Sequence, residues 1–500
     1  AAAEKRKRER IKSGAAKVDP DDKRNQTGKH NKNKKNQPRE ATQEEVEKAL
    51  KETLSRLQQP KGKNNSSKYK RERRELEREK HELELMEAQE QSKILKLTEF
   101  VTANDLANMM NVPVNKIIGT GEQYFNSLNF PRTHLTFVEN ENGNSTRYGK
   151  KGNWVIPNLP PLSCGDVKAE KYDDEWLTIG EKVVTPFYEI EFNTDGSIES
   201  LYDRKLQREW VNGEFNKLKL YKDNPGVYDA WDILPNYKDR EVEVKILSPL
   251  KTVEKNSEVV SFACTLGTEK STWKRIIRVF RQSRGIEVEN IVDWNEKHVL
   301  AKAQFDCNVL TRKAVCDTSA GFVERETHRN TTWQQARFEV CHHKWVDMAE
   351  TDGGIALIND SKYGVGLLEN SMSLSLLRAT IRPDVTSDLG HHEFAYMIYP
   401  HGDDFVKAEI NNIAYEYNVP LGKADLTCEN SFGELYMQTM KMSEDGSMIV
   451  IRLSEQNGRR GRISLDGRVK LLNFLEDVVD EIDTIEYKPF EIITIGIKVK

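Results

Sequence analysis

Residues 187–202 read FYEIEFNTDGSIESLY and join two alternating runs through a turn. Alternation of apolar and polar residues gathers the apolar side chains on one face, which is typical of a half-buried β-strand. The NTDG segment at 193–196 favours a tight turn, because glycine adopts positive φ at little steric cost. The stretch therefore predicts a β-hairpin with strands at 187–192 and 198–202.

Further short runs of this kind continue to the end of the chain, and helical periodicity is almost absent among them. Short strands separated by Gly, Asn and Asp turns favour β-sandwiches over an α/β barrel. The predicted fold class is therefore mainly β. We expect strands at 154–161, 242–247, 259–266, 273–280, 286–294, 301–309, 338–347, 354–359, 364–368, 394–399, 431–442, 448–454, 462–465, 469–474 and 491–499.

The beginning of the chain has a different composition. The first 100 residues contain 28 Lys and Arg against 19 Asp and Glu, although the whole chain has a net charge of −4. Residues 1–40 almost lack large apolar side chains, so we expect them to be disordered, and residues 68–92 to form a solvated helix. Such a basic arm either contacts nucleic-acid phosphates or is simply a solvated tail.

Cysteine usage and hydropathy predict the compartment. The six cysteines lie far apart and form no Cys-x-x-Cys pair, which suits a reducing cytoplasm. No apolar run reaches the roughly 18 residues of a membrane span, so neither a transmembrane helix nor a membrane partner is expected. The charged N-terminus lacks the apolar core of a signal peptide. We therefore expect a cytoplasmic protein.

Residues 222–232, KDNPGVYDAWD, interrupt the β pattern. A turn at the proline and glycine is followed by Tyr228, Asp229, Trp231 and Asp232. Aromatic faces beside carboxylates match the needs of a sugar, whose apolar ring face stacks while its hydroxyls donate hydrogen bonds. The alternative is an ordinary loop, with the two aromatic rings tucked under a sheet and the two carboxylates in water.

Several stretches resemble the C-terminal half of glycoside hydrolase family 38, the α-mannosidases. In the family's order they are FNSLNFPRT, NTDGSIESLYDRKLQRE, DNPGVYDAWDI, VDWNEKHVLAKAQF, THRNTTWQQARFEVCHHKWVDMAE, ALINDSKYGVGLLENSMSLSLLRA, HHEFAYMIYPH and YKPFEIITI. The resemblance covers residues 124–500. It implies a large β-supersandwich with smaller flanking β-sandwich domains, which in the family packs against a catalytic barrel and lines part of the sugar cleft.

The same resemblance implies site residues. Tyr228 matches a tyrosine that hydrogen-bonds substrate in the family, and its loop brings Asp229, Trp231 and Asp232 to the cleft. Arg378, in SLLRA, matches an arginine at the cleft rim; its alternative role is a structural ion pair. Two polar segments are possible cleft walls: His391 with His392, and His328 with Arg329 and Trp333. The second segment could equally anchor a crossover between sheets.

Catalytic groups are expected to come from elsewhere. Family catalysis implies an aspartate nucleophile, an acid/base carboxyl and a zinc ion held by two Asp and two His, with nucleophile and zinc ligands in the barrel. We find neither set here, so no catalytic or metal residue is predicted and the chain is expected to be inactive alone. His342 and His343 lie in the predicted strand 338–347, where neighbours point to opposite faces, so no metal site is expected there.

A second resemblance covers residues 4–120. KETLSRLQQPKGKNNSSKYKRERRE and LKLTEFVTANDLANMMNVPVNKIIGT resemble the basic linker and helical subdomain of bacterial translation initiation factor two. It implies contact with ribosomal RNA, but no G-x-x-x-x-G-K-S/T motif occurs, so GTPase activity is not implied. The join near residue 120 reflects either a natural fusion or two genes that were merged by an assembly or gene-calling error.

Together these patterns divide the chain into five segments. They are a basic disordered and helical region at 1–93, a truncated factor-like subdomain at 94–120, a small β-domain at 121–175, a mannosidase-like supersandwich at 176–424 and a C-terminal β-domain at 425–500. Two functions remain. The first is the β-rich half of an α-mannosidase, with an α-mannoside or oligosaccharide and the missing barrel as partners. The second is a translation-factor fragment that contacts the ribosome.

Overall fold

The computed structural model describes residues 123–168, 175–423 and 432–499. The described part is mainly β, as the alternating runs predicted. The expectations for residues 1–122, including the initiation-factor resemblance, lie outside the described residues. Within the described residues, no helix is long and apolar enough to cross a membrane.

The hairpin predicted at 187–202 is confirmed. Strands β8 (Tyr188–Phe192) and β9 (Ile198–Asp203) pair antiparallel. Gly196 closes the turn with φ 77°, and its N–H donates to the Asn193 carbonyl at 3.0 Å. The hairpin belongs to a five-stranded sheet in the order β10-β9-β8-β7-β6. The other strands are β6 (Thr178–Ile179), β7 (Val183–Val184) and β10 (Arg208–Glu209).

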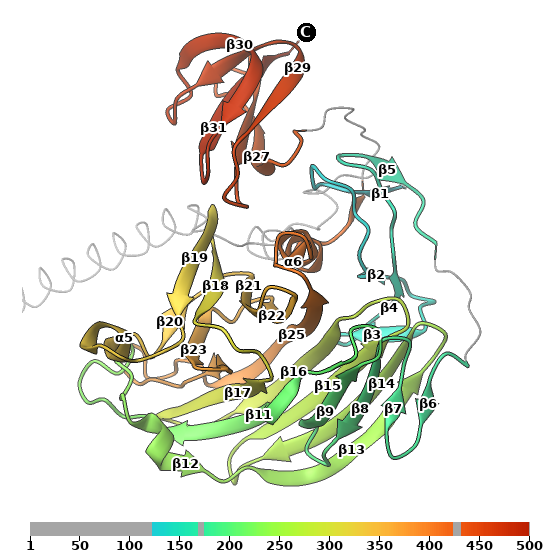
Figure 1. Cartoon of the computed structure of the whole chain (residues 1–500), viewed down its shortest axis with the longest axis vertical. Helices are drawn as coiled ribbons and strands as arrows, with labels where there is room; N and C mark the ends of the chain where they lie inside the picture. Colours follow the sequence, from blue (N-terminus) through green and yellow to red (C-terminus); the bar gives the residue numbers. More distant parts are fainter. Residues whose placement is uncertain (1–122, 169–174, 424–431, 500) are drawn as a thin grey trace, which may run out of the picture. The chain divides into compact units, whose positions relative to one another are not determined.

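Two larger antiparallel sheets form the body of the protein (Figure 1). The six-stranded sheet has the order β12-β11-β17-β24-β23-β20, and the nine-stranded sheet has the order β13-β14-β15-β16-β25-β22-β21-β18-β19. The first contains β11 (Val211–Lys222), β12 (Glu241–Val242), β17 (Val299–Cys307), β20 (Val340–Cys341), β23 (Gly364–Leu368) and β24 (Ser371–Leu377). The second contains β13 (Lys245–Lys255), β14 (Val259–Gly267), β15 (Thr272–Phe280), β16 (Ile286–Trp294), β18 (Lys313–Thr318), β19 (Gly321–Glu326), β21 (Trp345–Ala349), β22 (Gly353–Asn359) and β25 (Gly390–Gly402).

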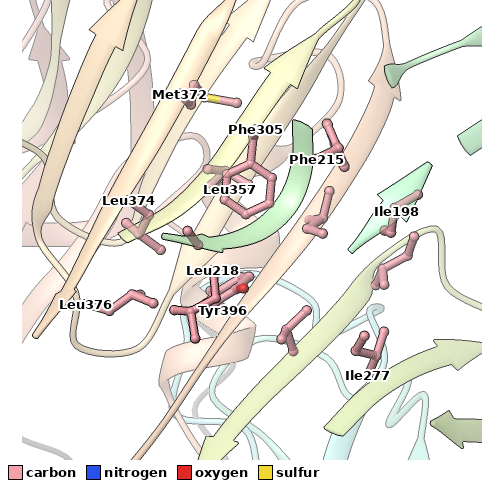
Figure 2. Packing of buried hydrophobic residues seen from close by; sticks show 14 of the residues in the cluster. Ile198, Phe215, Leu218, Ile277, Phe305, Leu357, Met372, Leu374, Leu376 and Tyr396 are labelled. Atoms are coloured by element: carbon pink, nitrogen blue, oxygen red, sulfur yellow. The ribbon is translucent and has the colours of Figure 1, made fainter. Parts of the chain in front are cut away.

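The main hydrophobic core is shared by these sheets, as Figure 2 shows. Period-two alternation in β24 sends Met372, Leu374 and Leu376 into the core while the serines between them face the other side. Phe305 of β17 meets Tyr396 of β25 edge-to-face, with ring centroids 5.9 Å apart. Each fully buried side chain of this size contributes about 1.5–3 kcal/mol. The core therefore fixes the six-stranded sheet against the nine-stranded one.

The strand predicted at 338–347 is wrong, because the chain changes sheets within it. β20 ends at Cys341 in the six-stranded sheet, and β21 begins at Trp345 in the nine-stranded sheet. His342 and His343 form the crossing, where their N–H groups donate to the carbonyls of Tyr363 and Asp317. Local alternation cannot reveal this, since both strands carry the same pattern.

Smaller elements surround the body. The strand predicted at 154–161 mostly fails: β4 ends at Val155, because the prolines that follow cannot donate to a ladder. The helices of the described residues are η1 (Tyr237–Arg240), α5 (Thr332–Ala336) and α6 (Ile410–Asn418). Two three-stranded sheets, β2-β4-β3 and β26-β1-β5, comprise β1 (Tyr124–Phe125), β2 (Thr136–Glu139), β3 (Ser145–Arg147), β4 (Lys150–Val155), β5 (Cys164–Gly165) and β26 (Gly422–Lys423).

The C-terminal strands form a separate five-stranded sheet in the order β27-β28-β31-β29-β30. Its strands are β27 (Tyr436–Met442), β28 (Met448–Ser454), β29 (Gly461–Leu472), β30 (Val478–Tyr487) and β31 (Ile492–Lys498). The strands predicted at 462–465 and 469–474 are one strand, β29, whose pairing with β30 is irregular between Ser464 and Val469. β30 was not predicted, because most of its residues are acidic or exposed.

Candidate functional site

Three connections emerge at one end of the six-stranded sheet. Lys222, the last residue of β11, pairs with Val299 at the start of β17, and Ala301 pairs with Leu377 at the end of β24. Because these neighbours are antiparallel, the segments 223–236, 295–298 and 378–389 leave the sheet on the same side. The last two also cross to β16 and β25 of the nine-stranded sheet. The candidate site is built from these three connections.

The first connection carries an exposed aromatic pair. Tyr228 and Trp231 are 66% and 68% exposed, and their rings meet edge-to-face with centroids 6.2 Å apart. The N–H groups of Trp231 and Asp232 donate to the Tyr228 carbonyl at 3.0 and 3.1 Å, which holds the segment in a tight turn. Gly226 precedes it with φ 103°, a conformation that favours glycine. The turn therefore presents both rings to solvent.

Asp229 lies between the two rings in sequence, yet it is fully buried. Its carboxylate accepts N–H hydrogen bonds from Ile381 at 2.6 Å and from Arg382 at 3.0 Å, and His298 Nδ1 lies 3.6 Å away. Desolvation by itself would raise the pKa of Asp229, but the backbone donors outweigh it and lower the pKa below its ordinary value. Asp229 therefore ties the aromatic turn to the segment after β24.

Arg378 makes a second tie between the same segments. Its Nε and Nη2 donate to the buried carboxylate of Asp223 at 2.7 and 2.6 Å, and Nη2 also donates to the Asp232 carbonyl. The other Asp223 oxygen accepts the Leu234 N–H at 2.9 Å. Within the described residues, Nη1 of Arg378 has no protein partner. The arginine thus forms the structural ion pair that the sequence left open and retains one amino group for a ligand.

His391 and His392, which the sequence predicted as a cleft wall, have different surroundings. Asp388 accepts the N–H groups of Arg378 and Ala379 at 2.9 and 3.0 Å, and its own carbonyl lies 2.8 Å from His392 Nε2. His392 is thereby joined to the Arg378 segment. His391 is exposed and lies 2.8 Å from Asp293, which raises the pKa of His391. His391 therefore lies near the start of β25, paired with Asp293 of β16, and in the described part of the chain no contact joins it to the aromatic turn.

The other predicted cleft wall, formed by His328, Arg329 and Trp333, lies beside η1. His328 and Arg329 precede α5, and Arg329 interacts electrostatically with Tyr237 of η1. The Tyr237 hydroxyl donates to Glu339, just after α5, at 2.8 Å. Trp333 is 75% exposed on α5, and in the described part of the chain no hydrogen bond or ring contact joins it to Tyr228 or Trp231. These contacts do not bring Trp333 to the aromatic turn.

Three residues that hold the turn were not predicted as site residues: Asp223, His298 and Asp388. Asp223 and His298 have partners far away in the sequence, as in the bond from Arg378 to Asp223 across 155 positions, whereas the partners of Asp388 lie within ten positions. The polar character of the 383–388 loop was visible, but nothing in it showed that Asp388 accepts two backbone N–H groups. Only the antiparallel order of β11, β17 and β24 brings the segments together.

The described residues do not fit a zinc site. Among them, no group of three or more His, Cys, Asp or Glu side chains could hold a metal ion. His342 is buried, which lowers its pKa to about 3, and its Nε2 lies 3.0 Å from Asn359 Nδ2. His401 Nε2 lies 2.9 Å from Asp347. These histidines are engaged in pairwise contacts within the body.

Replacing Asp229 with Asn is expected to lower the free energy of unfolding by about 1–3 kcal/mol at neutral pH, since hydrogen bonds to a charged acceptor weaken. Because the folded pKa is depressed, the wild-type advantage is complete above the unfolded value near 3.8 and disappears as pH falls through the folded pKa. Urea unfolding of both proteins between pH 7 and pH 3 measures this difference. A difference that grows toward pH 3 would contradict the assignment.

The segments that carry this geometry match known protein families. Residues 183–386 match the glycosyl hydrolases family 38 C-terminal domain, and residues 434–495 match the family 38 C-terminal β-sandwich domain. These two segments are therefore similar to the C-terminal domains of glycosyl hydrolase family 38. The first includes Tyr228, Trp231 and Arg378, so the whole aromatic turn and its two ties lie inside the segment that matches the family 38 C-terminal domain.

Relatives extend the similarity beyond those segments. Alpha-mannosidase G of Dictyostelium discoideum is 31% identical over 350 residues, which are 62% of this chain and 32% of that protein. The crystal structure of an alpha-mannosidase from Enterococcus faecalis V583 superposes with a TM-score of 0.56 at 12% identity, covering 80% of this chain and 52% of that one. The latter similarity shows the fold alone. The chain spans about a third of the curated relative and half of the solved structure.

A different protein also matches part of the chain. Translation initiation factor IF-2 of Phocaeicola vulgatus is 50% identical over 96 residues, which are 19% of this chain and 10% of that factor. The chain is thus similar to two unrelated kinds of protein, and the family 38 similarity accounts for the larger share.

Proposed function

We propose that this chain acts as the β-rich C-terminal half of a family 38 α-mannosidase and contributes one wall of an α-mannoside-binding cleft. One observation carries the proposal. Tyr228 and Trp231 are exposed on a turn that the buried Asp229 carboxylate holds in place, and this turn lies in the segment that matches a family 38 domain. Exposed aromatic rings on a turn held by buried carboxylates are unusual in a loop without a ligand, because such rings are normally covered.

The chemistry of the turn suits a sugar. Two aromatic rings provide apolar faces for the C–H side of a pyranose ring. Next to them, Asp232 is exposed and offers acceptors, while Arg378 Nη1 offers donors to hydroxyl groups. A single wall buries only part of a ligand, so we expect dissociation constants for a simple mannoside in the millimolar range or weaker.

In this proposal the barrel of a family 38 enzyme supplies the opposite wall, the catalytic carboxyls and the zinc ion. The described residues of this chain hold no ligand set for zinc. The role of Asp229 is to position the turn, since both its oxygens face backbone N–H groups rather than solvent.

Replacing Tyr228 or Trp231 with Ala is expected to weaken binding of methyl α-D-mannopyranoside at this site at least about fivefold, because a stacking face worth about 1 kcal/mol is removed. Ligand-observed NMR titration of the full chain measures the affinity. Both rings are largely exposed, so the fold should survive either change. Phe474→Ala, which removes a ring that is 67% exposed in the turn between β29 and β30, is the matched control.

Trp333→Ala tests whether the predicted wall at Trp333 contacts the sugar together with the aromatic turn. If only the turn contacts the sugar, this variant binds as the wild type does. Unchanged affinity in both Tyr228→Ala and Trp231→Ala would place the mannoside elsewhere and remove the basis of the proposal.

The second candidate function rests on the IF-2 similarity. In that case we propose that the basic N-terminal residues contact ribosomal RNA. Salt-sensitive RNA binding that disappears when residues 1–40 are deleted would favour it.

A further inference from the structure

A cavity of about 210 Å³ lies between the segment leading into α6 and the start of the C-terminal sheet. The rings of Phe130 and Phe405 line it, together with the polar side chains of Glu409, Asn412 and Asn457. None of these residues belongs to the aromatic turn or its supporting segments. The cavity is therefore a separate feature from the site of the proposed function.

The walls of this cavity are held by specific contacts. The Asn129 carboxamide donates to the Leu435 carbonyl at 2.6 Å and accepts the Met437 N–H at 2.8 Å. Tyr436 stacks on Tyr415 of α6 with ring centroids 5.3 Å apart and an interplanar angle of 15°. These contacts join the C-terminal sheet to residues 129 and 415 with defined geometry, so the cavity has fixed walls.

Polar groups that the fold does not use remain in the lining. The Tyr436 hydroxyl donates to Asn412 Oδ1 at 2.7 Å, and within the described residues the Asn412 amide nitrogen has no partner. Within the described residues, the Glu409 carboxylate has no hydrogen-bond partner either. Glu434 and Arg459 form an ion pair, with 3.1 Å between Glu434 Oε1 and Arg459 Nη1. The lining thus carries one uncompensated negative charge and both donors and acceptors.

These features restrict the ligand. The unpaired carboxylate of Glu409 disfavours an anion. Hydroxyl groups both donate and accept, so they match a carboxamide nitrogen beside a carboxylate. Phe130 and Phe405 supply the apolar surface that a sugar ring also needs. The volume is below the roughly 300–1,000 Å³ of cavities for drug-sized ligands, which limits an occupant to about one ring.

We propose that this cavity binds a neutral, polyhydroxylated ligand of monosaccharide size, at a second site independent of the Tyr228–Trp231 pair. Binding here would also bridge α6 and the C-terminal sheet, because Asn412 belongs to the helix and Asn457 to the sheet's β28–β29 connection.

The test uses the full chain carrying Tyr228→Ala and Trp231→Ala, so that the first site does not contribute. Methyl α-D-mannopyranoside is the probe, titrated by ligand-observed NMR. Adding Val406→Phe, which places a ring in the cavity lining, is expected to weaken the remaining binding at least about tenfold. Adding Glu409→Gln is expected to weaken it about threefold to tenfold, through loss of a charged acceptor.

Glu369→Gln is the matched control for Glu409→Gln, because both glutamates are exposed and have nearly equal positive φ, 53° and 54°. It should leave affinity unchanged. Glu409→Gln is isosteric and exposed, so it keeps the test decisive if Val406→Phe fails to fold, as judged by its thermal unfolding.

Three results would overturn the inference. The first is no mannoside binding in the double-variant background, and the second is residual binding that both cavity variants leave unchanged. The third is that ethylammonium binds more tightly than the mannoside and that Glu409→Gln abolishes this ethylammonium binding. The last would assign the cavity to a cation. Complete loss of mannoside binding in the double-variant background would still support the first site, so failure here is distinguishable from failure of the proposed function.

Discussion

The purified chain of 500 residues is expected to release no detectable nitrophenol from para-nitrophenyl α-D-mannopyranoside, with or without added zinc. A retaining glycosidase places two carboxyls about 5–5.5 Å apart across the scissile bond. At the aromatic turn, Asp229 faces two backbone N–H groups in the interior, and Asp232 is exposed three residues later. Glycoside hydrolysis at enzymatic rates, at least about a millionfold above the uncatalysed rate, generally uses such a pair, so a turn without one should give only the uncatalysed rate.

The control for this assay is a separately expressed family 38 barrel, measured alone and mixed with the chain. Turnover that appears only in the mixture would support the proposal that the barrel supplies the catalytic groups and this chain one wall of the cleft. Zinc-dependent turnover by the chain alone, abolished by Asp232→Asn, would show instead that the chemistry resides at the turn.

Local alternation predicted much of the β-structure. The strand expected at 286–294 is β16, that at 364–368 is β23 and that at 448–454 is β28, with the same first and last residues. Half-buried antiparallel strands impose a period of two on their own sequence, so a single strand carries its own signal. The connections carry no such signal, which is why the crossing at His342 and His343 was missed.

The aromatic turn shows what the pattern could not supply. The plain-loop alternative put Tyr228 and Trp231 under a sheet and Asp229 in water, following the usual preferences of these residue types. The structure has the opposite arrangement: both rings are exposed and Asp229 is buried. A buried carboxylate needs donors, and these come from Ile381 and Arg382, about 150 positions away. Only the assembled sheet order brings them within reach.

The largest expected effect on stability comes from a buried charge cluster between the small β2-β4-β3 sheet and the nine-stranded sheet. Glu287 of β16 is fully buried, accepts from Arg147 Nη2 at 2.8 Å and from Arg278 Nη1 at 3.0 Å, and lies 3.1 Å from the Tyr417 hydroxyl. Arg278 also pairs with Glu289 at 2.7 Å. Burial acts to lower the pKa of Arg278, but the two glutamates outweigh it and raise that pKa.

Replacing Glu287 with Gln is expected to lower the free energy of unfolding by about 3–5 kcal/mol, because the Arg147 guanidinium would lose the carboxylate that it pairs with, while Arg278 would keep only Glu289. Urea unfolding followed by tryptophan fluorescence measures the change, since Trp154 lies 5.7 Å from the Arg147 guanidinium and is buried. Glu139→Gln, which breaks the exposed Lys150–Glu139 pair, is the control and should cost less than about 1 kcal/mol.

A second substitution tests the electrostatic origin of that loss. Arg147→Met in the Glu287→Gln background removes the guanidinium that has lost its carboxylate partner, so it should recover part of the lost stability, although Arg147→Met alone should be destabilising. Such opposite signs for the same change in two backgrounds arise from charge pairing and not from packing volume. Additive losses from the two substitutions would instead show that Glu287 acts through shape alone, and a loss below about 1 kcal/mol for Glu287→Gln would show that water reaches the cluster.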